Sequence, residues 1–149
     1  MGIPDPHTDP QFYENVPIRR LAAFVVDTII IFAIWVVLIF VGSILSAVTL
    51  GLGAPLVALA FSISGFAYRW LLVTQRSATL GMMLTGIEIR DAAGNKLNPT
   101  IGFVHTFAYY VTLFILPLAI IGWVLMASSA HRRAMHDTFL GTVVINRPA

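Results

Sequence analysis

Four ionisable side chains lie within or beside long apolar stretches of this sequence. Arg20 and Asp27 open the first stretch, Arg69 stands near the end of the second, and His105 lies in the third. If these stretches span a bilayer, a carboxylate near the centre costs about 2.5–3.5 kcal/mol and needs a partner or a proton. We therefore expect Arg20, Asp27, Arg69 and His105 to gather in one intramembrane polar cluster.

The spacing of these residues indicates how they meet. Asp27 follows Arg20 by seven residues, which is close to two helical turns, so both lie on one helix face. Arg69 stands a similar distance from the polar end of its own stretch, so its guanidinium is expected to reach Asp27. His105 falls in the same layer. Three hydroxyls are available there, from Tyr68, Tyr109 and Tyr110.

Two interpretations of this cluster are open. In the first, Asp27 and Arg69 form a buried ion pair that fixes the register of the helices. In the second, Asp27 changes protonation or binds a cation during transport, with Arg69 or His105 tuning its proton affinity. The structural interpretation is favoured, because intramembrane charges are tolerated when they are paired.

Other reactive groups point to no enzyme. Arg19, His136 and Asp137 are expected at the cytoplasmic edge, and the adjacent pair of His136 and Asp137 offers too few ligands for a metal. The chain has no cysteine, which excludes disulfides and thiolate sites. Phosphate-loop, nucleophile-elbow and dinucleotide motifs are also missing from the sequence. We expect neither catalysis nor a cofactor.

The composition is that of a membrane protein. Of 149 residues, 58% are hydrophobic and 11% charged, and the mean hydropathy is +0.85. Soluble domains are nearer 45–50% apolar and about 25% charged. The net charge of +2 is read as a determinant of membrane orientation, and nucleic acid is not an expected partner.

The apolar stretches predict the helices that hold the cluster. Residues 1–18 are polar and proline-rich, and we expect an extended tail. No charge occurs between Asp27 and Arg69, over about twice the length that one span needs. Two helices at about 20–46 and 55–74 fit, broken by glycine and proline at 51–55.

A polar loop over 75–100 separates these helices from the third apolar stretch. It is expected to hold a short interfacial helix and a hairpin of 86–90 with the residues after a turn at 91–95, while 142–145 is another strand candidate. Pro117 divides the third stretch into helices at about 101–116 and 118–130.

This third stretch either crosses the membrane once or folds back as a hairpin. The hairpin is favoured, because it returns the basic residues at 131–133 to the side of Arg19, Arg20 and Arg76, which the positive-inside rule makes cytoplasmic. The predicted fold class is an all-α membrane protein with three to four transmembrane or re-entrant helices and a small cytoplasmic β-hairpin or strand element. It forms one domain over 19–147, with its N-terminus in the cytoplasm.

Small residues recur every four positions on two of these helices. Such stripes let helices approach closely in a membrane. Packing within the chain is the favoured interpretation, and contact with a partner's helix is the alternative. The residues are Gly42 and Ser46 on the first helix and Ala54, Ala58 and Ser62 on the second.

Four segments of the sequence resemble the RDD family of small bacterial membrane proteins. They are RLAAFVVD at 20–27, ATLG at 78–81, GIEIRD at 86–91 and MHDTFLGT at 135–142. The resemblance maps the arginine and the two aspartates that name the family onto Arg20, Asp27 and Asp137, which it implies are close at the cytoplasmic edge. The sequence departs from the family pattern at Met82, where a basic residue is common, and at Leu140, where alanine is usual.

The resemblance implies two functions of different kinds. Some members are described as monovalent cation/proton antiporters, and others accompany larger membrane assemblies. The favoured hypothesis is a non-catalytic accessory or assembly subunit of a membrane complex. The alternative is an antiporter that acts as a homo-oligomer, with Asp27 as its ion- or proton-binding carboxylate.

Overall fold

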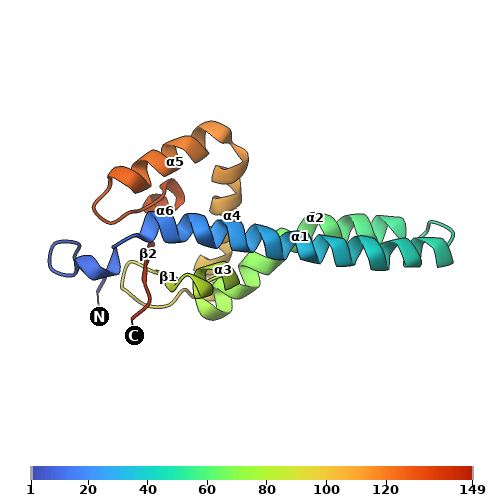
Figure 1. The fold of residues 1–149 in the computed structure, drawn as a ribbon, viewed down its shortest axis with the longest axis horizontal. Helices are drawn as coiled ribbons and strands as arrows, with labels where there is room; N and C mark the ends of the chain where they lie inside the picture. Colours follow the sequence, from blue (N-terminus) through green and yellow to red (C-terminus); the bar gives the residue numbers. More distant parts are fainter. Residues whose placement is uncertain (1, 149) are drawn as a thin grey trace.

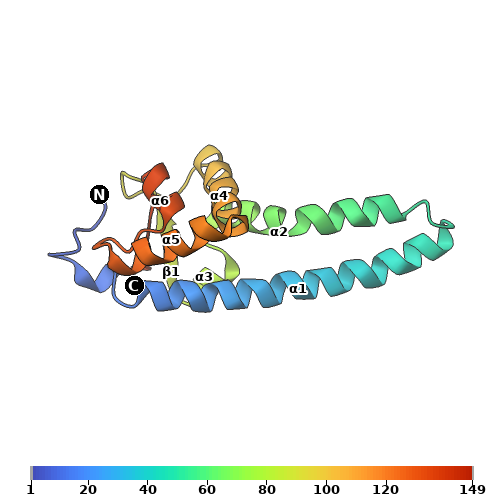
Figure 2. The same ribbon diagram turned by 90° about the horizontal axis from the view of Figure 1, so that it is seen from above.

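Two long helices form the main axis of the molecule. In the computed structural model, which describes residues 2–148, α1 covers Val16–Val48 and α2 covers Ala54–Arg76. They run side by side in opposite directions and extend away from the rest of the chain (Figures 1 and 2). The 33 residues of α1 measure about 50 Å, which exceeds a bilayer core of about 30 Å.

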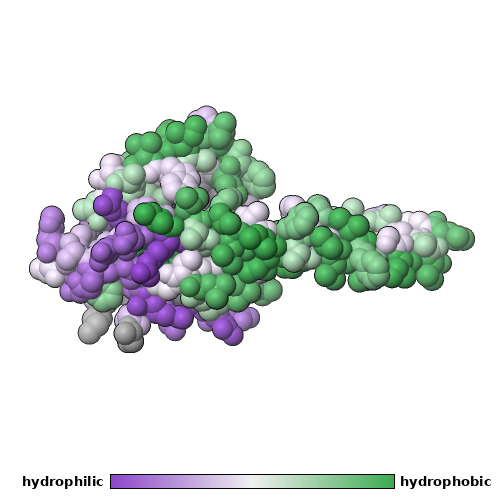
Figure 3. Space-filling view, viewed as in Figure 1, coloured by the Kyte–Doolittle hydropathy of each residue, from purple (hydrophilic) through white to green (hydrophobic). Residues whose placement is uncertain are grey.

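The surface of this α1–α2 hairpin is apolar. Within residues 2–148, two helices are long and apolar enough to cross a membrane, and a bent pair makes a third if it counts as one span. Hydrophobic side chains cover the hairpin, while hydrophilic ones gather at the opposite end of the molecule (Figure 3). The predicted class of an all-α membrane protein with a small strand element is confirmed.

The remaining elements pack around the N-terminal half of α1 and the C-terminal half of α2. They are η1 (Pro10–Phe12), α3 (Leu80–Leu84), β1 (Ile87–Arg90), α4 (Pro99–Phe114), α5 (Leu116–Ser128), α6 (Met135–Leu140) and β2 (Val143–Asn146). A buried cluster that includes Val16, Ala23, Val73, Ile87 and Ile89 joins α1, α2 and β1. This apolar core holds the polar residues in a fixed frame.

The third apolar stretch is broken where proline predicts it. The axes of α4 and α5 differ by 111°, with the break at Ile115 and Pro117 in the first turn of α5. Proline is accommodated there, because the first turn of a helix needs no amide donor. The chain therefore turns sharply between the two helices. Each of them is too short to cross the bilayer core as one straight helix.

The predicted hairpin within residues 86–97 is wrong. β1 pairs instead with the distant strand β2, antiparallel, with Ile87 opposite Asn146 and Arg90 opposite Val143. A turn does form after β1, where Asp91 accepts hydrogen bonds from two following amides. The chain beyond this turn leads into Pro99 and α4, and it offers fewer apolar side chains than β2, whose first three residues are buried.

The predicted extended tail is also shorter and more ordered than expected. α1 begins at Val16, because Pro17 fits its first turn, and η1 precedes it. Tyr13 is buried beside Val143 and Ile145, and its hydroxyl donates to the carbonyl oxygen of Pro4 at 2.7 Å. The N-terminal segment is thus part of the folded domain.

Candidate functional site

The carboxylate of Asp27 joins three helices. Its Oδ1 accepts hydrogen bonds from the Tyr68 hydroxyl on α2 at 2.7 Å and from the Gly81 amide on α3 at 2.8 Å. Its Oδ2 accepts a bond from the Thr79 hydroxyl at 2.6 Å. Asp27 is only 8% exposed, and its three hydrogen bonds are made inside the protein. These hydrogen bonds come from α2 and α3, and they fix α1, α2 and α3 relative to one another.

Local backbone geometry brings α3 against this carboxylate. The Thr79 hydroxyl caps α3 by accepting a bond from the Met82 amide, so it bonds the helix and Asp27 at once. A Cβ atom at Gly81 would lie 2.3 Å from the carbonyl oxygen of Ala23 and 2.8 Å from Asp27 Oδ1. Glycine is required here because any side chain would push α3 away from α1.

Arg69 lies in the same layer, yet it makes no ion pair with Asp27. Within residues 2–148, no carboxylate oxygen lies within 4.0 Å of the Arg69 guanidinium. Its guanidinium carbon stands 3.6 Å above the ring centre of Tyr109, a cation–π contact. The expected contact between Asp27 and Arg69 is therefore corrected: the hydroxyl and amide donors around Asp27 already occupy its oxygens.

Asp137 is the second buried carboxylate, and it pairs with Arg20. Its Oδ2 accepts bonds from Arg20 Nη2 at 2.5 Å and from the Ala134 amide at 3.1 Å. Its Oδ1 lies 3.0 Å from His105 Nε2 and accepts a bond from the Thr142 hydroxyl at 3.3 Å. These contacts clamp α1, α4 and the C-terminal segment together, as the resemblance implied for Arg20 and Asp137.

The charges around Asp137 favour its ionised form. Burial opposes ionisation, but the Arg20 guanidinium and the hydrogen bond with His105 hold the pKa of Asp137 well below its usual value. Burial lowers the pKa of His136 to about 3, although the charge of Asp137 acts in the opposite direction. His136 is therefore neutral at physiological pH, beside an ionised Asp137.

Arg19 does not join His136 and Asp137. Its Nη1 donates instead to the carbonyl oxygen of Thr85 at 3.1 Å, at the end of α3. Successive residues on a helix point about 100° apart, so only one of Arg19 and Arg20 can face Asp137. The expected edge network thus contains Arg20 in place of Arg19.

One small cavity brings the residues of the predicted cluster together. Its volume is about 70 Å³. Its lining includes all four residues of the predicted intramembrane cluster together with His136 and Asp137: Arg20, Asp27, Arg69, His105, His136 and Asp137. The two carboxylates are held at separate points of the cavity by separate sets of donors. The polar layer is real, but its ion pair joins Arg20 to Asp137.

Three residues here could hold a metal ion. His105, His136 and Asp137 are buried and each offers one ligand atom, all within 4.8 Å of one another. Asp137 also holds Arg20, whose positive charge opposes a second cation at the same carboxylate. The geometry supplies three ligands, whereas structural zinc sites use four.

The small residues of the two long helices behave differently. Gly42 packs on α2, where an added Cβ would meet Val57 at 2.4 Å, and Ser46 is half-buried. Ala54, Ala58 and Ser62 are exposed, so this stripe does not serve packing within the chain. The expectation of internal packing holds for the α1 pair and is corrected for the α2 stripe.

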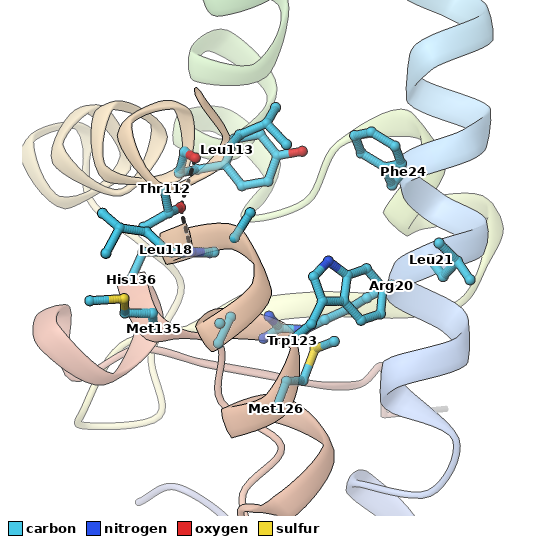
Figure 4. Close-up of a pocket in the computed structure, with 14 residues that line it drawn as sticks. Arg20, Leu21, Phe24, Thr112, Leu113, Leu118, Trp123, Met126, Met135 and His136 are labelled. Atoms are coloured by element: carbon cyan, nitrogen blue, oxygen red, sulfur yellow. Dashed lines mark hydrogen bonds between the residues drawn. The ribbon is translucent and has the colours of Figure 1, made fainter. Parts of the chain in front are cut away.

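An apolar groove of about 490 Å³ opens beside Arg20, between α1 and the α4–α5 pair. Figure 4 shows Leu21 and Phe24 on one side and Trp123 and Met126 on the other. His136 lines it too, with its Nδ1 3.3 Å from the Thr112 hydroxyl. The groove therefore places apolar side chains beside Arg20, which pairs with Asp137.

Three residues important to the site were not among the predicted site residues. Thr79 and Gly81 bind Asp27, and Thr142 binds Asp137. The first two belong to the ATLG segment and the third to MHDTFLGT, both quoted above for the resemblance. The two family segments were therefore the sequence signal for these residues, because the spacing of charged residues did not point to them.

The fold and the site define a small helical membrane protein with a network of buried polar groups at one end of an apolar helical hairpin. The RDD family model matches residues 16–141, and the chain belongs to the RDD family. No curated protein matches the chain significantly, and no solved structure does either.

Proposed function

We propose that the chain is a non-catalytic accessory or assembly subunit of a larger membrane complex. The carrying observation is the stripe of Ala54, Ala58 and Ser62, whose three residues are all exposed on α2. Small residues allow close helix contacts inside a bilayer, where apolar side chains alone gain little from association. Another membrane protein, or a second copy, is the partner that this surface fits.

The state of the buried carboxylates supports a structural role for the polar layer. Asp27 accepts three hydrogen bonds and Asp137 takes part in four contacts, each from a different residue. A transport carboxylate must exchange its ligands during each cycle, whereas these two are each held by several donors from different elements. The layer then serves to hold the α1–α2 hairpin in a fixed position for its partner.

The proposed placement is a bacterial inner membrane, with several spans and a cytoplasmic N-terminus. Arg19 lies in the first turn of α1, Arg76 ends α2, and Arg90 and Lys96 follow in β1 and the loop after it, whereas the α1–α2 connection has no basic residue. Cytoplasmic loops are enriched in lysine and arginine. The bend of 111° between α4 and α5 supports a re-entrant pair that returns Arg132 and Arg133 to the same side.

The test is purification of the tagged full-length chain from its native membrane in a mild detergent, followed by mass spectrometry. We expect a partner in stoichiometric amount. Ala58→Leu, which fills the stripe, is expected to release it, while Ala47→Leu, at an exposed alanine on α1, should retain it. Retention of the same partner by both variants would contradict a role for the stripe.

The alternative function is monovalent cation/proton exchange by a homo-oligomer. The observation that favours it is the position of Asp27, a carboxylate within α1 that lines the polar cavity. Under exchange, Asp27→Asn abolishes pH-dependent cation flux in vesicles while the protein still folds. Intact flux in folded Asp27→Asn protein would refute that mechanism, and absence of flux in the wild-type chain would remove the alternative.

A further inference from the structure

A second and larger groove runs between α1, α2 and α4. Its volume is about 740 Å³, and half of the residues that line it are aromatic, among them Phe24, Phe32, Trp35, Phe61, Phe66 and Phe114. From Phe24 to Trp35 it follows α1 for about 16 Å. Phe32 and Phe114 are well exposed, so the groove opens onto the surface that the bilayer covers.

A buried cation lies at the polar end of this groove. Arg69 lines the groove, is 8% exposed, and has no carboxylate partner within 4.0 Å in residues 2–148. Its Nε is buried without a hydrogen bond, and its main contact is the ring of Tyr109. A cation kept at this depth without an anion is costly, so Arg69 is suited to receive a negative group from outside the chain.

The nearest carboxylate does not fill this role. Asp27 also lines the groove, but its oxygens accept bonds from Tyr68, Thr79 and Gly81. These donors lie on α2 and at the start of α3, and Asp27 forms no ion pair with Arg69. Arg69 therefore remains the unmatched charge at this end of the groove.

We propose that the groove binds an anionic phospholipid, with its phosphate on Arg69 and an acyl chain along the aromatic walls. A guanidinium presents a planar fork of donors that suits phosphate, and a lipid in the bilayer can reach the groove sideways. The groove thus matches both ends of one amphiphile. The proposal is independent of the accessory role, because a structural lipid can bind with or without a protein partner.

The test measures lipid binding to the full-length protein in a non-ionic detergent by native mass spectrometry. The probes are phosphatidylglycerol, diacylglycerol with the same acyl chains, and inorganic phosphate. We expect phosphatidylglycerol to bind at least about tenfold more tightly than diacylglycerol, because a hydrogen bond to a charged group contributes that much. Inorganic phosphate at matched concentration should neither bind detectably nor displace the lipid.

Two substitutions test the charge of Arg69 and the free space of the groove separately. Arg69→Met keeps the length of the side chain and removes its charge, and we expect binding at least about tenfold weaker, with partial recovery in Arg69→Lys. Thr28→Trp fills the groove at an exposed position whose hydroxyl bonds only its own helix. Ile29→Trp adds the same ring to an exposed neighbour outside the groove and serves as its control.

The outcomes decide the proposal in either direction. Weaker binding in Arg69→Met and Thr28→Trp, with wild-type binding in Ile29→Trp, would support it. Equal affinity for diacylglycerol, unchanged binding in folded Arg69→Met, or displacement of the lipid by inorganic phosphate would each overturn it. If Arg69→Met does not fold, the two tryptophan variants and the diacylglycerol comparison still decide.

Discussion

Replacing Asp137 by asparagine should remove much of the stability of the domain. Asparagine keeps one acceptor oxygen and places an NH₂ group where the other oxygen was. If this group faces Arg20, two donors meet; if it faces His105, Arg20 retains only a neutral acceptor. Either orientation leaves a largely buried guanidinium without its counter-charge.

The magnitude follows from the burial of the pair. Breaking a buried ion pair by removing one partner costs about 3–5 kcal/mol. The Arg20 side chain is 11% exposed and Asp137 is not exposed at all, so some water reaches the arginine. We therefore expect Asp137→Asn to lower the free energy of unfolding by about 3 kcal/mol, at the lower end of that range.

The assay is reversible unfolding in mixed micelles, followed by circular dichroism and by fluorescence of the three tryptophans. Asp91→Asn is the control, because it removes a carboxylate from a surface turn and should change stability by no more than about 0.5 kcal/mol. A double-mutant cycle with Arg20→Met isolates the pair itself. Loss of less than about 1 kcal/mol in Asp137→Asn, or no coupling in the cycle, would refute the reasoning.

Three further predictions concern packing and pH. Gly81→Ala should move α3 from Ala23 and reduce stability by about 1–3 kcal/mol, measured in the same unfolding assay. Gly42→Leu should splay α1 from α2, since its Cβ already meets Val57, and a crosslink between the helices should then form more slowly. The pKa of His136 is lowered from 6.5 to about 3 on folding, so protonation favours the unfolded chain: stability is complete above pH 6.5 and falls by about 1.4 kcal/mol per pH unit as pH drops toward 3. His136→Gln should flatten that slope between pH 6 and 4, and an unchanged slope would contradict burial as its cause.

The long elements could be predicted because one physical signal dominates them. The uncharged stretch between Asp27 and Arg69, divided by Gly51 and Pro55, corresponds to α1 and α2, and Pro117 marks the break between α4 and α5. These features act locally, through hydropathy and backbone chemistry. They can be recognised without knowing which segments of the chain pack together.

The pairing of distant segments could not be predicted in this way. β1 has two sequence-compatible partners, the nearby residues after Asp91 and the distant β2, and burial of Val143 and Val144 decides between them. Charge spacing placed Asp27 and Arg69 at one depth and made the Tyr68 hydroxyl available there, but it could not show that neutral donors from Thr79 and Gly81 would take the place of Arg69. The Tyr68 and Thr79 hydroxyls and the Gly81 amide hold Asp27 without any cation.

The division between Arg19 and Arg20 shows the same limit. Both stand at the start of α1, and the sequence alone gives each an equal claim on Asp137. The rotation of α1 on its apolar core turns Arg20 toward Asp137 and Arg19 toward the carbonyl oxygen of Thr85. Packing therefore assigns the partners of these two charges.

The proposed accessory function is tested most directly by comparing three tagged chains purified from the native membrane: wild type, Ala58→Leu and Ala47→Leu. The measurement is the amount of each co-purifying membrane protein per chain, by quantitative mass spectrometry. We expect one partner at constant stoichiometry in the wild type and in Ala47→Leu, and its loss in Ala58→Leu, because leucine blocks close helix contact at the exposed stripe. A chain that purifies without any stoichiometric partner, and that carries out Asp27-dependent cation/proton exchange in vesicles, would contradict the accessory role.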